Sequence, residues 1–301
     1  MSFLKNITLM VLVNGLILMI LALISSIIFS GTPVQTTPFG AEDTSFYQSL
    51  ALYSLLWGMG GSVISLALSK YICRMIYGVQ DVSEVGEYRE LVHLVYRLAE
   101  QAGIRKMPEV GVYESSGPNA FATGMTRNSA LVAVSTGLLR SMEKDEVEAV
   151  LAHEISHVVN GDMVTMTLLQ GIVNAFAIFV SDVIARALSR RDNNAPSMAV
   201  YMAARILIQY VVLFFGSIVV YWFSRRREYR ADAGSAHLVG KDKMIRALQS
   251  LGRSAHLLTP PDSRVATLQI AAHPSKVASI FSTHPSIEER IDALRHSTYA
   301  D

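Results

Sequence analysis

Long apolar segments without a single charge alternate with polar stretches along this chain. Four of these segments approach or exceed the ~20 residues that cross a bilayer as a helix, and they cover residues 7–29, 50–68, 163–181 and 206–223. The second segment contains Gly58, Gly60 and Gly61, small residues that let membrane helices pack closely. The first lacks a convincing signal-peptide cleavage site at its end, so we read it as a retained anchor. The pattern predicts about four transmembrane or membrane-embedded helices.

The remaining sequence has the periodicity of a small folded domain. Residues 83–102 and 142–159 repeat apolar positions at helical spacing, and residues 109–113 and 130–135 are typical of short β-strands. The second of these helices has Ser141 as a plausible N-cap and Asn160-Gly161 as a C-terminal stop. The predicted fold is a mainly α membrane protein with a small α+β domain.

The order of the segments divides the chain into four parts. Residues 1–70 are a membrane hairpin, and residues 71–162 are the first part of the folded domain. Residues 163–223 are an inserted hydrophobic helix pair. Residues 224–301 are a second, mostly helical part of the folded domain, broken by Pro260-Pro261. We therefore expect the folded domain to be built from two stretches of chain that the inserted pair separates.

The composition agrees with a membrane protein. Of 301 residues, 51% are hydrophobic and 17% are charged, and the mean hydropathy is +0.33. The net charge of +1 gives no reason to expect a nucleic-acid partner. The single cysteine, Cys73, excludes an internal disulfide and a cysteine-based zinc site.

The distribution of basic residues predicts the orientation in the membrane. Residues 31–49 contain no Lys or Arg, whereas Lys70 and Arg74 follow the second apolar segment and three arginines at 225–227 follow the fourth. Cytoplasmic loops carry the excess of basic residues in membrane proteins. Both termini and the folded domain are therefore expected in the cytoplasm.

Four arginines conflict with this predicted orientation. They lie around the connection between the third and fourth apolar segments and are Arg186, Arg190, Arg191 and Arg205. The same rule expects few positive charges on the far side of the membrane. Either this connection crosses despite its charge, or residues 163–223 form a hairpin that does not fully span. The sequence alone leaves both interpretations open.

The strongest chemical motif is H-E-x-x-H at residues 153–157, inside the predicted helix 142–159. Residues four apart share one face of a helix, so the imidazoles of His153 and His157 can bind one ion. A zinc ion held in this way lowers the pKa of a water molecule, and Glu154 can take the proton of that water. A chance match is the alternative, but polar groups at the end of an apolar helix need a partner, and a metal ion is one. The motif predicts zinc peptidase chemistry.

A catalytic zinc site needs a third protein ligand and an open position for water. Several acidic residues and histidines downstream could supply the ligand: Asp162, Asp182, Glu228, Asp232, His237, His256, His273 and His284. Glu228 and Asp232 are four residues apart, so one could bind the metal while the other orients a ligating histidine. The alternative is a surface pattern of arginine–carboxylate pairs, and spacing alone does not separate the two.

Several motifs occurring in order give the chain a family resemblance. After H-E-I-S-H and the hydrophobic insertion comes E-Y-R-A-D-A-G at residues 228–234. Residues 118–124 read P-N-A-F-A-T-G, residues 130–139 read A-L-V-A-V-S-T-G-L-L, and residues 283–286 read T-H-P-S, with Arg290-Ile291 beyond them. Together they resemble the HtpX family of membrane zinc metallopeptidases, relatives of the CAAX prenyl proteases. The likeness covers nearly the whole chain and implies a zincin-like (gluzincin) catalytic domain.

The resemblance assigns roles at the metal. It implies that His153, His157 and Glu228 bind one Zn²⁺ per chain and that Glu154 is the general base. Asp232 would orient one of the metal ligands.

Further roles concern the substrate. The resemblance implies that Asn119 and Ala120 lie on a strand edge that pairs with an extended substrate; without it, Asn119 would be read as a turn residue. His284 is a candidate to stabilise the developing oxyanion, and Arg290 to fix His284 or the substrate. Without the resemblance, His284 would be read only as the residue before Pro285 at a helix start.

The sequence thus supports one leading function and two alternatives. The leading hypothesis is a zinc endopeptidase in a bacterial cytoplasmic membrane, with its active site facing the cytoplasm. Its expected partners are the lipid bilayer and unfolded or membrane-protein substrates, and the resemblance implies quality control of damaged membrane proteins under stress. One alternative is a dedicated processing peptidase. The other is a non-catalytic membrane assembly factor whose metal is structural, which would not require Glu154.

Overall fold

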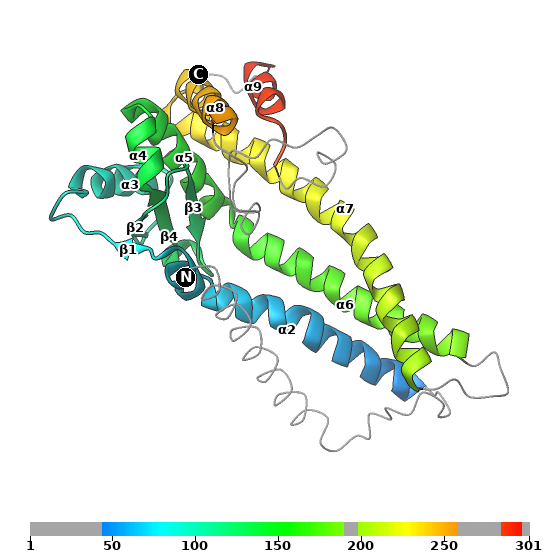
Figure 1. The fold of residues 1–301 in the computed structure, drawn as a ribbon. Helices are drawn as coiled ribbons and strands as arrows, with labels where there is room; N and C mark the ends of the chain where they lie inside the picture. Colours follow the sequence, from blue (N-terminus) through cyan, green and yellow to red (C-terminus); the bar gives the residue numbers. More distant parts are fainter. Residues whose placement is uncertain (1–43, 190–197, 258–283, 297–301) are drawn as a thin grey trace. The chain divides into compact units, whose positions relative to one another are not determined.

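The computed structural model describes residues 44–189, 198–257 and 284–296. The chain forms two compact units, one of residues 1–66 and 166–220 and the other of residues 67–165 and 221–301. Three long helices, α2 (Thr44–Tyr77), α6 (Asp162–Ser189) and α7 (Met198–Val239), contribute residues to both units. Figure 1 shows these helices together with a small sheet and its shorter helices.

The first unit consists of the apolar parts of the three long helices. All three are long and apolar enough to cross a membrane, which agrees with the second, third and fourth predicted segments. The predicted segment 7–29 lies outside the described residues. Large apolar side chains such as Ile172, Phe176 and Leu207 are exposed on these helices, as expected for surfaces that face lipid. Helices α2 and α6 pack so closely at Gly58 that a Cβ there would overlap the backbone of Ala175.

A buried polar cluster joins α6 to α7 within this unit. Asp182 of α6 lies 2.7 Å from the Nε of Arg186 and accepts a 2.5 Å hydrogen bond from the hydroxyl of Tyr201 on α7. The Nε of Arg205 lies 3.2 Å from the same carboxylate. Two of the four arginines that conflicted with the predicted orientation are therefore paired with a carboxylate. The other two, Arg190 and Arg191, lie outside the described residues.

The second unit is built on a four-stranded mixed sheet in the order β1-β2-β4-β3. The strands are β1 (Gln80–Asp81), β2 (Glu109–Tyr113), β3 (Ala120–Thr123) and β4 (Leu131–Ser135). β2 runs parallel to β4, and β3 runs antiparallel to β4 with Phe121 opposite Ala133. β3 is thus an edge strand, and no strand within the described residues pairs with its outer side.

The two faces of the sheet have different partners. One face carries Val110, Val112, Val132 and Val134, which join the main core with α3 (Arg89–Gln101) and α5 (Lys144–Asn160). The other face carries Tyr113, Phe121 and Ala133, which pack against Tyr77 near the end of α2. Alternation of side chains along each strand produces this division.

Both predicted strands are confirmed, and the helix ends are partly corrected. α3 begins at Arg89 instead of residue 83, because the preceding segment turns through Gly86 with φ of 120°. α5 begins at Lys144, and the prediction of Ser141 as its N-cap is wrong, because Ser141 ends a separate short helix, α4 (Thr136–Ser141). The N–H of Glu143 instead donates to the carboxylate of Glu146, as in a capping box.

The C-terminal end of α5 agrees with the prediction, and further helices close the unit. Gly161 takes the left-handed conformation, with φ of 68°, and ends α5. α8 (Lys241–Leu257) packs on α5, and α9 (Ile287–His296) packs on α8. The predicted break at Pro260-Pro261 lies outside the described residues.

Small residues bring α5 and α7 together. Ser235 of α7 donates a 2.7 Å hydrogen bond to the carbonyl oxygen of Ala149 on α5. A Cβ at Gly234 would lie 2.5 Å from the Oγ of Ser156 and 2.9 Å from its Cβ. This close approach matters because α5 carries the two histidines of the motif and α7 carries Glu228.

We predict that Gly234→Ala lowers the midpoint of thermal unfolding of the detergent-purified protein by several degrees. Its methyl group would overlap Ser156, and overpacking of this kind costs about 1–3 kcal/mol. Adding Ser156→Gly should restore part of the loss, because it removes the overlapping atoms at the expense of a glycine in a helix. An unchanged midpoint in the single variant would contradict the close packing of α5 and α7.

Candidate metal centre

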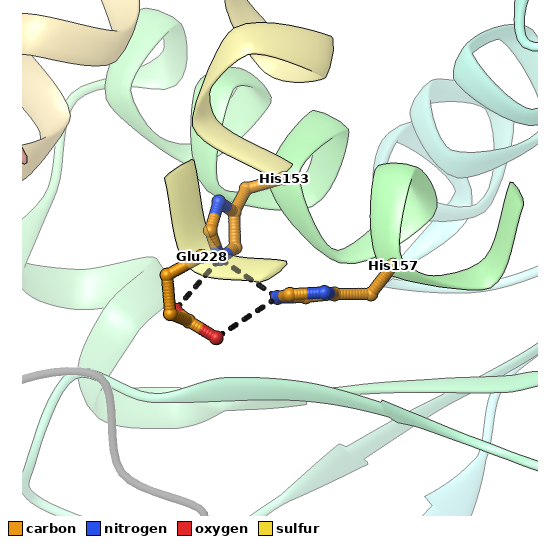
Figure 2. A group of neighbouring side chains, drawn as sticks. All are labelled: His153, His157 and Glu228. Carbon is orange, nitrogen blue, oxygen red and sulfur yellow. Dashed lines mark hydrogen bonds and ion pairs between the residues drawn. The ribbon is translucent and has the colours of Figure 1, made fainter. Parts of the chain in front are cut away.

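Three side chains from α5 and α7 converge on one point. Figure 2 shows the rings of His153 and His157 and the carboxylate of Glu228 turned toward one another. The Nε2 atoms of the two histidines are 3.1 Å apart. The carboxylate oxygens of Glu228 lie 3.5 Å from the Nε2 of His153 and 3.4 Å from the Nε2 of His157. All three residues are buried, and among the described residues they form the group of donors that could hold a metal ion.

The spacing of these donors fits a zinc ion. Three donors held at about 2.1 Å in a tetrahedral arrangement lie about 3.4 Å from one another, close to the separations seen here. Glu228 is fully buried, and neither carboxylate oxygen receives a hydrogen bond of normal geometry from the described part of the chain. The guanidinium groups of Arg227 and Arg290 lie 3.6 Å and 3.8 Å from this carboxylate, and a metal ion between it and the two imidazoles would be a closer cation.

Two more carboxylates contact the histidine rings at Nδ1, the ring nitrogen that does not face the other donors. Asp232 lies 3.0 Å from the Nδ1 of His153, and Asp162 lies 2.6 Å from the Nδ1 of His157. Each contact holds the Nδ1 side of its ring and leaves Nε2 for a metal, which is the usual arrangement around ligating histidines. The sequence analysis had assigned this role to Asp232 but had named Asp162 only as a possible ligand.

Asp162 could have been recognised from its position. It directly follows the left-handed Gly161 that ends α5, and it is the first residue of α6, 2.6 Å from the Nδ1 of His157. Asp162 also lies 3.3 Å from the guanidinium of Arg230 on α7. One carboxylate thereby connects the motif helix with the helix that carries Glu228.

Arg290 lies in the interior of this site. Its guanidinium binds both oxygens of Asp232, at 2.8 Å and 2.5 Å, and it is only 1% exposed. It comes from α9, so Asp232 is held by an element that is distant in sequence. The geometry connects Arg290 to His153 through Asp232.

His284 also enters the site, just before α9. Its Nδ1 lies 2.8 Å from an oxygen of Glu228, and its side chain is 15% exposed. The structure therefore brings His284 to the proposed metal ligands, on the same carboxylate that faces both motif histidines.

Glu154 connects the motif helix to the edge of the sheet. Its carboxylate accepts a 2.9 Å hydrogen bond from the backbone N–H of Ala122 in β3. Glu154 is buried as well, at 6% exposure. The contact fixes the orientation of the carboxylate beside the edge strand.

Ala120 is the first residue of this edge strand, and Asn119 directly precedes it. The backbone oxygen of Asn119 accepts from the N–H of Ser135 in β4, which pairs this position with the sheet. In an antiparallel ladder, alternate residues turn their backbone groups outward. In β3, Ala120 and Ala122 turn their backbone N–H and C=O groups away from β4. The hydrogen bond from the N–H of Ala122 to the carboxylate of Glu154 uses one of these outward groups.

The electrostatics of the metal-free site favour protons on the histidines. Burial by itself lowers the pKa of His157, but the carboxylates of Glu228 and Asp162 outweigh it and raise the pKa to about 9. Burial likewise opposes protonation of His153, and its contacts with Asp232 and Glu228 raise its pKa. Four carboxylates are buried here, those of Glu154, Asp162, Glu228 and Asp232, with Arg290 as the buried cation among them. The site therefore has an excess of negative charge that protons or a metal ion can balance.

Comparison with known proteins identifies the family of this chain. The sequence profile of peptidase family M48 matches residues 87–298. The "Protease HtpX homolog" of Bacillus licheniformis is 46% identical over 297 residues, which cover 96% of this chain and 98% of that protein. "Protease HtpX" of Tolumonas auensis is 43% identical over 299 residues, which cover 97% of this chain and 99% of that protein.

A solved structure shares the fold. The crystal structure of S. mikatae Ste24p superposes with a TM-score of 0.63 at 21% identity and covers 97% of this chain. This chain spans 64% of that longer protein. The expected fold class, a mainly helical membrane protein with a small mixed sheet, is confirmed. The chain belongs to peptidase family M48 and is a membrane metalloprotease of the HtpX group.

Proposed function

We propose that this protein is a zinc-dependent endopeptidase whose metal is held by His153, His157 and Glu228. The observation that carries the proposal is the convergence of two imidazoles and one buried carboxylate with separations of 3.1–3.5 Å. Neutral imidazoles and carboxylate oxygen are ligands that zinc prefers in catalytic sites. When bound, zinc would supply the positive charge that acidifies a water molecule and polarises the scissile carbonyl group.

Residues of the protein would then transfer the protons and stabilise the charge that develops in the reaction. Glu154, fixed by the N–H of Ala122, would take the proton of the attacking water and deliver it to the leaving amine. His284, whose Nδ1 lies 2.8 Å from Glu228, would donate a hydrogen bond to the oxyanion that develops on the carbonyl oxygen. Arg290 would act indirectly, by holding Asp232 against His153.

The edge strand supports an extended polypeptide as the substrate. The outward backbone groups of Ala120, together with the side chain of Asn119, would pair with the main chain of the substrate. Main-chain pairing requires little sequence preference, which suits an enzyme that cleaves many unfolded segments. We propose misfolded or damaged membrane proteins as the physiological substrates, in quality control under stress.

The charge pattern supports a bacterial cytoplasmic membrane with the catalytic domain and both termini in the cytoplasm. Lys70 and Arg74 belong to the unit that contains the metal centre, as do the arginines at 225–227. On the inserted pair, Asp182 neutralises part of the charge of Arg186 and Arg205. Pairing with Asp182 lowers the free-energy cost of carrying these arginines to the far side of the membrane. We therefore propose that residues 163–223 cross the membrane twice. We also propose the four-part domain organisation expected from the sequence.

The direct test is Glu154→Gln, because glutamine keeps the shape of the side chain but cannot take a proton. We predict that the variant retains zinc and loses at least 10²-fold in the rate of casein cleavage, the range expected for a general base. Detergent-purified wild type and variant would be compared for metal content and cleavage.

Two outcomes of this comparison would contradict the proposal. Equal cleavage by both proteins would exclude Glu154 as the base. Zinc in both proteins with no cleavage by either would favour a structural metal, as in an assembly factor. A dedicated processing peptidase would be indicated if only one defined protein, and no unfolded substrate, were cleaved.

A second prediction concerns protons. Because the pKa values of both motif histidines are raised in the metal-free site, at least one imidazole is protonated at neutral pH. Zinc requires neutral imidazoles, so at about pH 7.5 we expect its binding to release about one proton or more, and the number should fall as the pH rises above about 9. Calorimetry in buffers of different ionisation enthalpy measures this number. Tight zinc binding without proton release at about pH 7.5 would contradict the assigned ligands.

A further inference from the structure

An exposed face of α7 changes from apolar to basic along the helix. Phe215, Val219 and Trp222 are exposed and follow one another at helical spacing. Arg226 and Arg230, four and eight residues after Trp222, continue the same face and are exposed as well. An apolar surface of a membrane helix thus ends in a tryptophan and two arginines, which are residue types that anchor helices at the headgroup level of a bilayer.

Both arginines are turned back toward the apolar residues. The guanidinium of Arg226 lies 4.8 Å from the ring centroid of Trp222, and that of Arg230 lies 6.0 Å from the ring centroid of Phe223. Side chains of a helix lean toward its N-terminus, and here that direction leads to the aromatic rings. Because a cation is attracted to the face of an aromatic ring, these contacts hold both guanidinium groups near the level of the rings.

Neighbouring arginines on this helix differ in what they contact. Arg227 is turned inward, with its Nε 3.6 Å from Glu228 and its side chain 19% exposed. Arg226 has no carboxylate within ion-pair distance in the described part of the chain. Arg230 lies 3.3 Å from Asp162, but its side chain remains 55% exposed. The outward pair, Arg226 and Arg230, therefore keeps N–H donors that face away from the interior, and Asp162 helps to fix one of the two groups.

We propose that Arg226 and Arg230 bind the phosphate group of an anionic phospholipid, whose acyl chains lie along the apolar face that leads to Trp222. Guanidinium groups suit phosphate because their N–H groups form paired hydrogen bonds with its oxygens. A lipid is the expected source of this phosphate, because the two arginines continue the apolar surface of a membrane helix. A zwitterionic lipid also carries a phosphate, but the two arginines would repel its ammonium group. The inference requires a protein embedded in a membrane and does not depend on the metal.

The tryptophans of the chain provide a local probe for the test. The sequence has two, Trp57 and Trp222, so Trp57→Phe leaves Trp222 as the only one, beside the proposed site. Full-length Trp57→Phe protein would be reconstituted in phosphatidylcholine vesicles that contain a rising share of brominated phosphatidylglycerol, whose bromine atoms quench tryptophan fluorescence. The dependence of quenching on composition gives the preference for phosphatidylglycerol at Trp222. We expect a preference of about ten- to twentyfold, because each arginine at a membrane surface contributes up to about fivefold.

Substitution of each arginine should lower this preference. We expect a loss of about fivefold in Arg226→Gln, and of about two- to fivefold in Arg230→Gln, because Asp162 already neutralises part of the charge of Arg230. Arg105→Gln is the matched control, since it removes the same charge from an exposed position between α3 and β2 and should change the preference by less than about twofold. Equal preferences in Arg226→Gln and Arg105→Gln, or no preference in the parent protein, would overturn the inference.

Two further measurements check the probe and the source of the phosphate. Native mass spectrometry of the chain with both tryptophans, in detergent, should show more bound phosphatidylglycerol than phosphatidylcholine, and less of it in Arg226→Gln; equal binding by the two proteins would contradict the site. Sodium phosphate should reduce the quenching of Trp222 no more than sodium chloride of the same ionic strength, because both salts screen charge equally. A loss specific to phosphate would indicate a site for a soluble anion and would overturn the assignment to a lipid.

Discussion

The structure depends on one buried carboxylate, that of Glu228, which faces two imidazoles in the interior of the protein. An isolated charge is very unfavourable in such surroundings, so the surrounding residues must compensate for it. α5 and α7 approach closely enough for this only because Gly234 and Ser235 are small. The two carboxylates behind the histidine rings and Arg290 on α9 then fix the donors in place. In the proposed zinc centre, a divalent cation would balance the negative charge that remains.

The inserted helix pair places a further constraint on this site. The histidines come before the apolar residues 163–223 in sequence, and Glu228 comes after them. The chain must therefore leave the catalytic domain and return to the same side before the third donor can reach the first two. The cluster of Asp182 with Arg186, Tyr201 and Arg205 joins the two helices of this pair in their own unit. It offers a physical reason why arginines can lie near the connection of two apolar helices.

The sequence predicted those features that depend on local spacing. Three of the apolar segments, the strands at residues 109–113 and 131–135, and the end of α5 at Gly161 all follow from periodicity or backbone preference. The pairing of the H-E-x-x-H helix with residues 228–234 came from the family resemblance, because spacing alone could not separate a metal-site pair at Glu228 and Asp232 from a surface pattern of arginine–carboxylate pairs.

Other features depend on tertiary contacts and could not be read from the chain. Arg290, for example, reaches Asp232 from α9, a separate helix that is distant in sequence. The N-cap of α5 was misassigned because Ser141 ends a helix that the sequence pattern did not separate from α5. The bond from Ala122 to Glu154 depends on which side of β3 faces away from β4, which requires the pairing of the strands to be known.

X-ray absorption at the zinc edge of the purified, zinc-loaded protein tests the central claim most directly. Two imidazole nitrogens at about 2.0–2.1 Å and oxygen ligands at about 2.0–2.2 Å are predicted for the wild type. In Glu228→Ala, the two imidazoles should remain while an oxygen ligand is lost or the zinc content falls. A sulfur ligand in the wild type, or an identical spectrum and zinc content in Glu228→Ala, would contradict the assignment of His153, His157 and Glu228 as the metal centre.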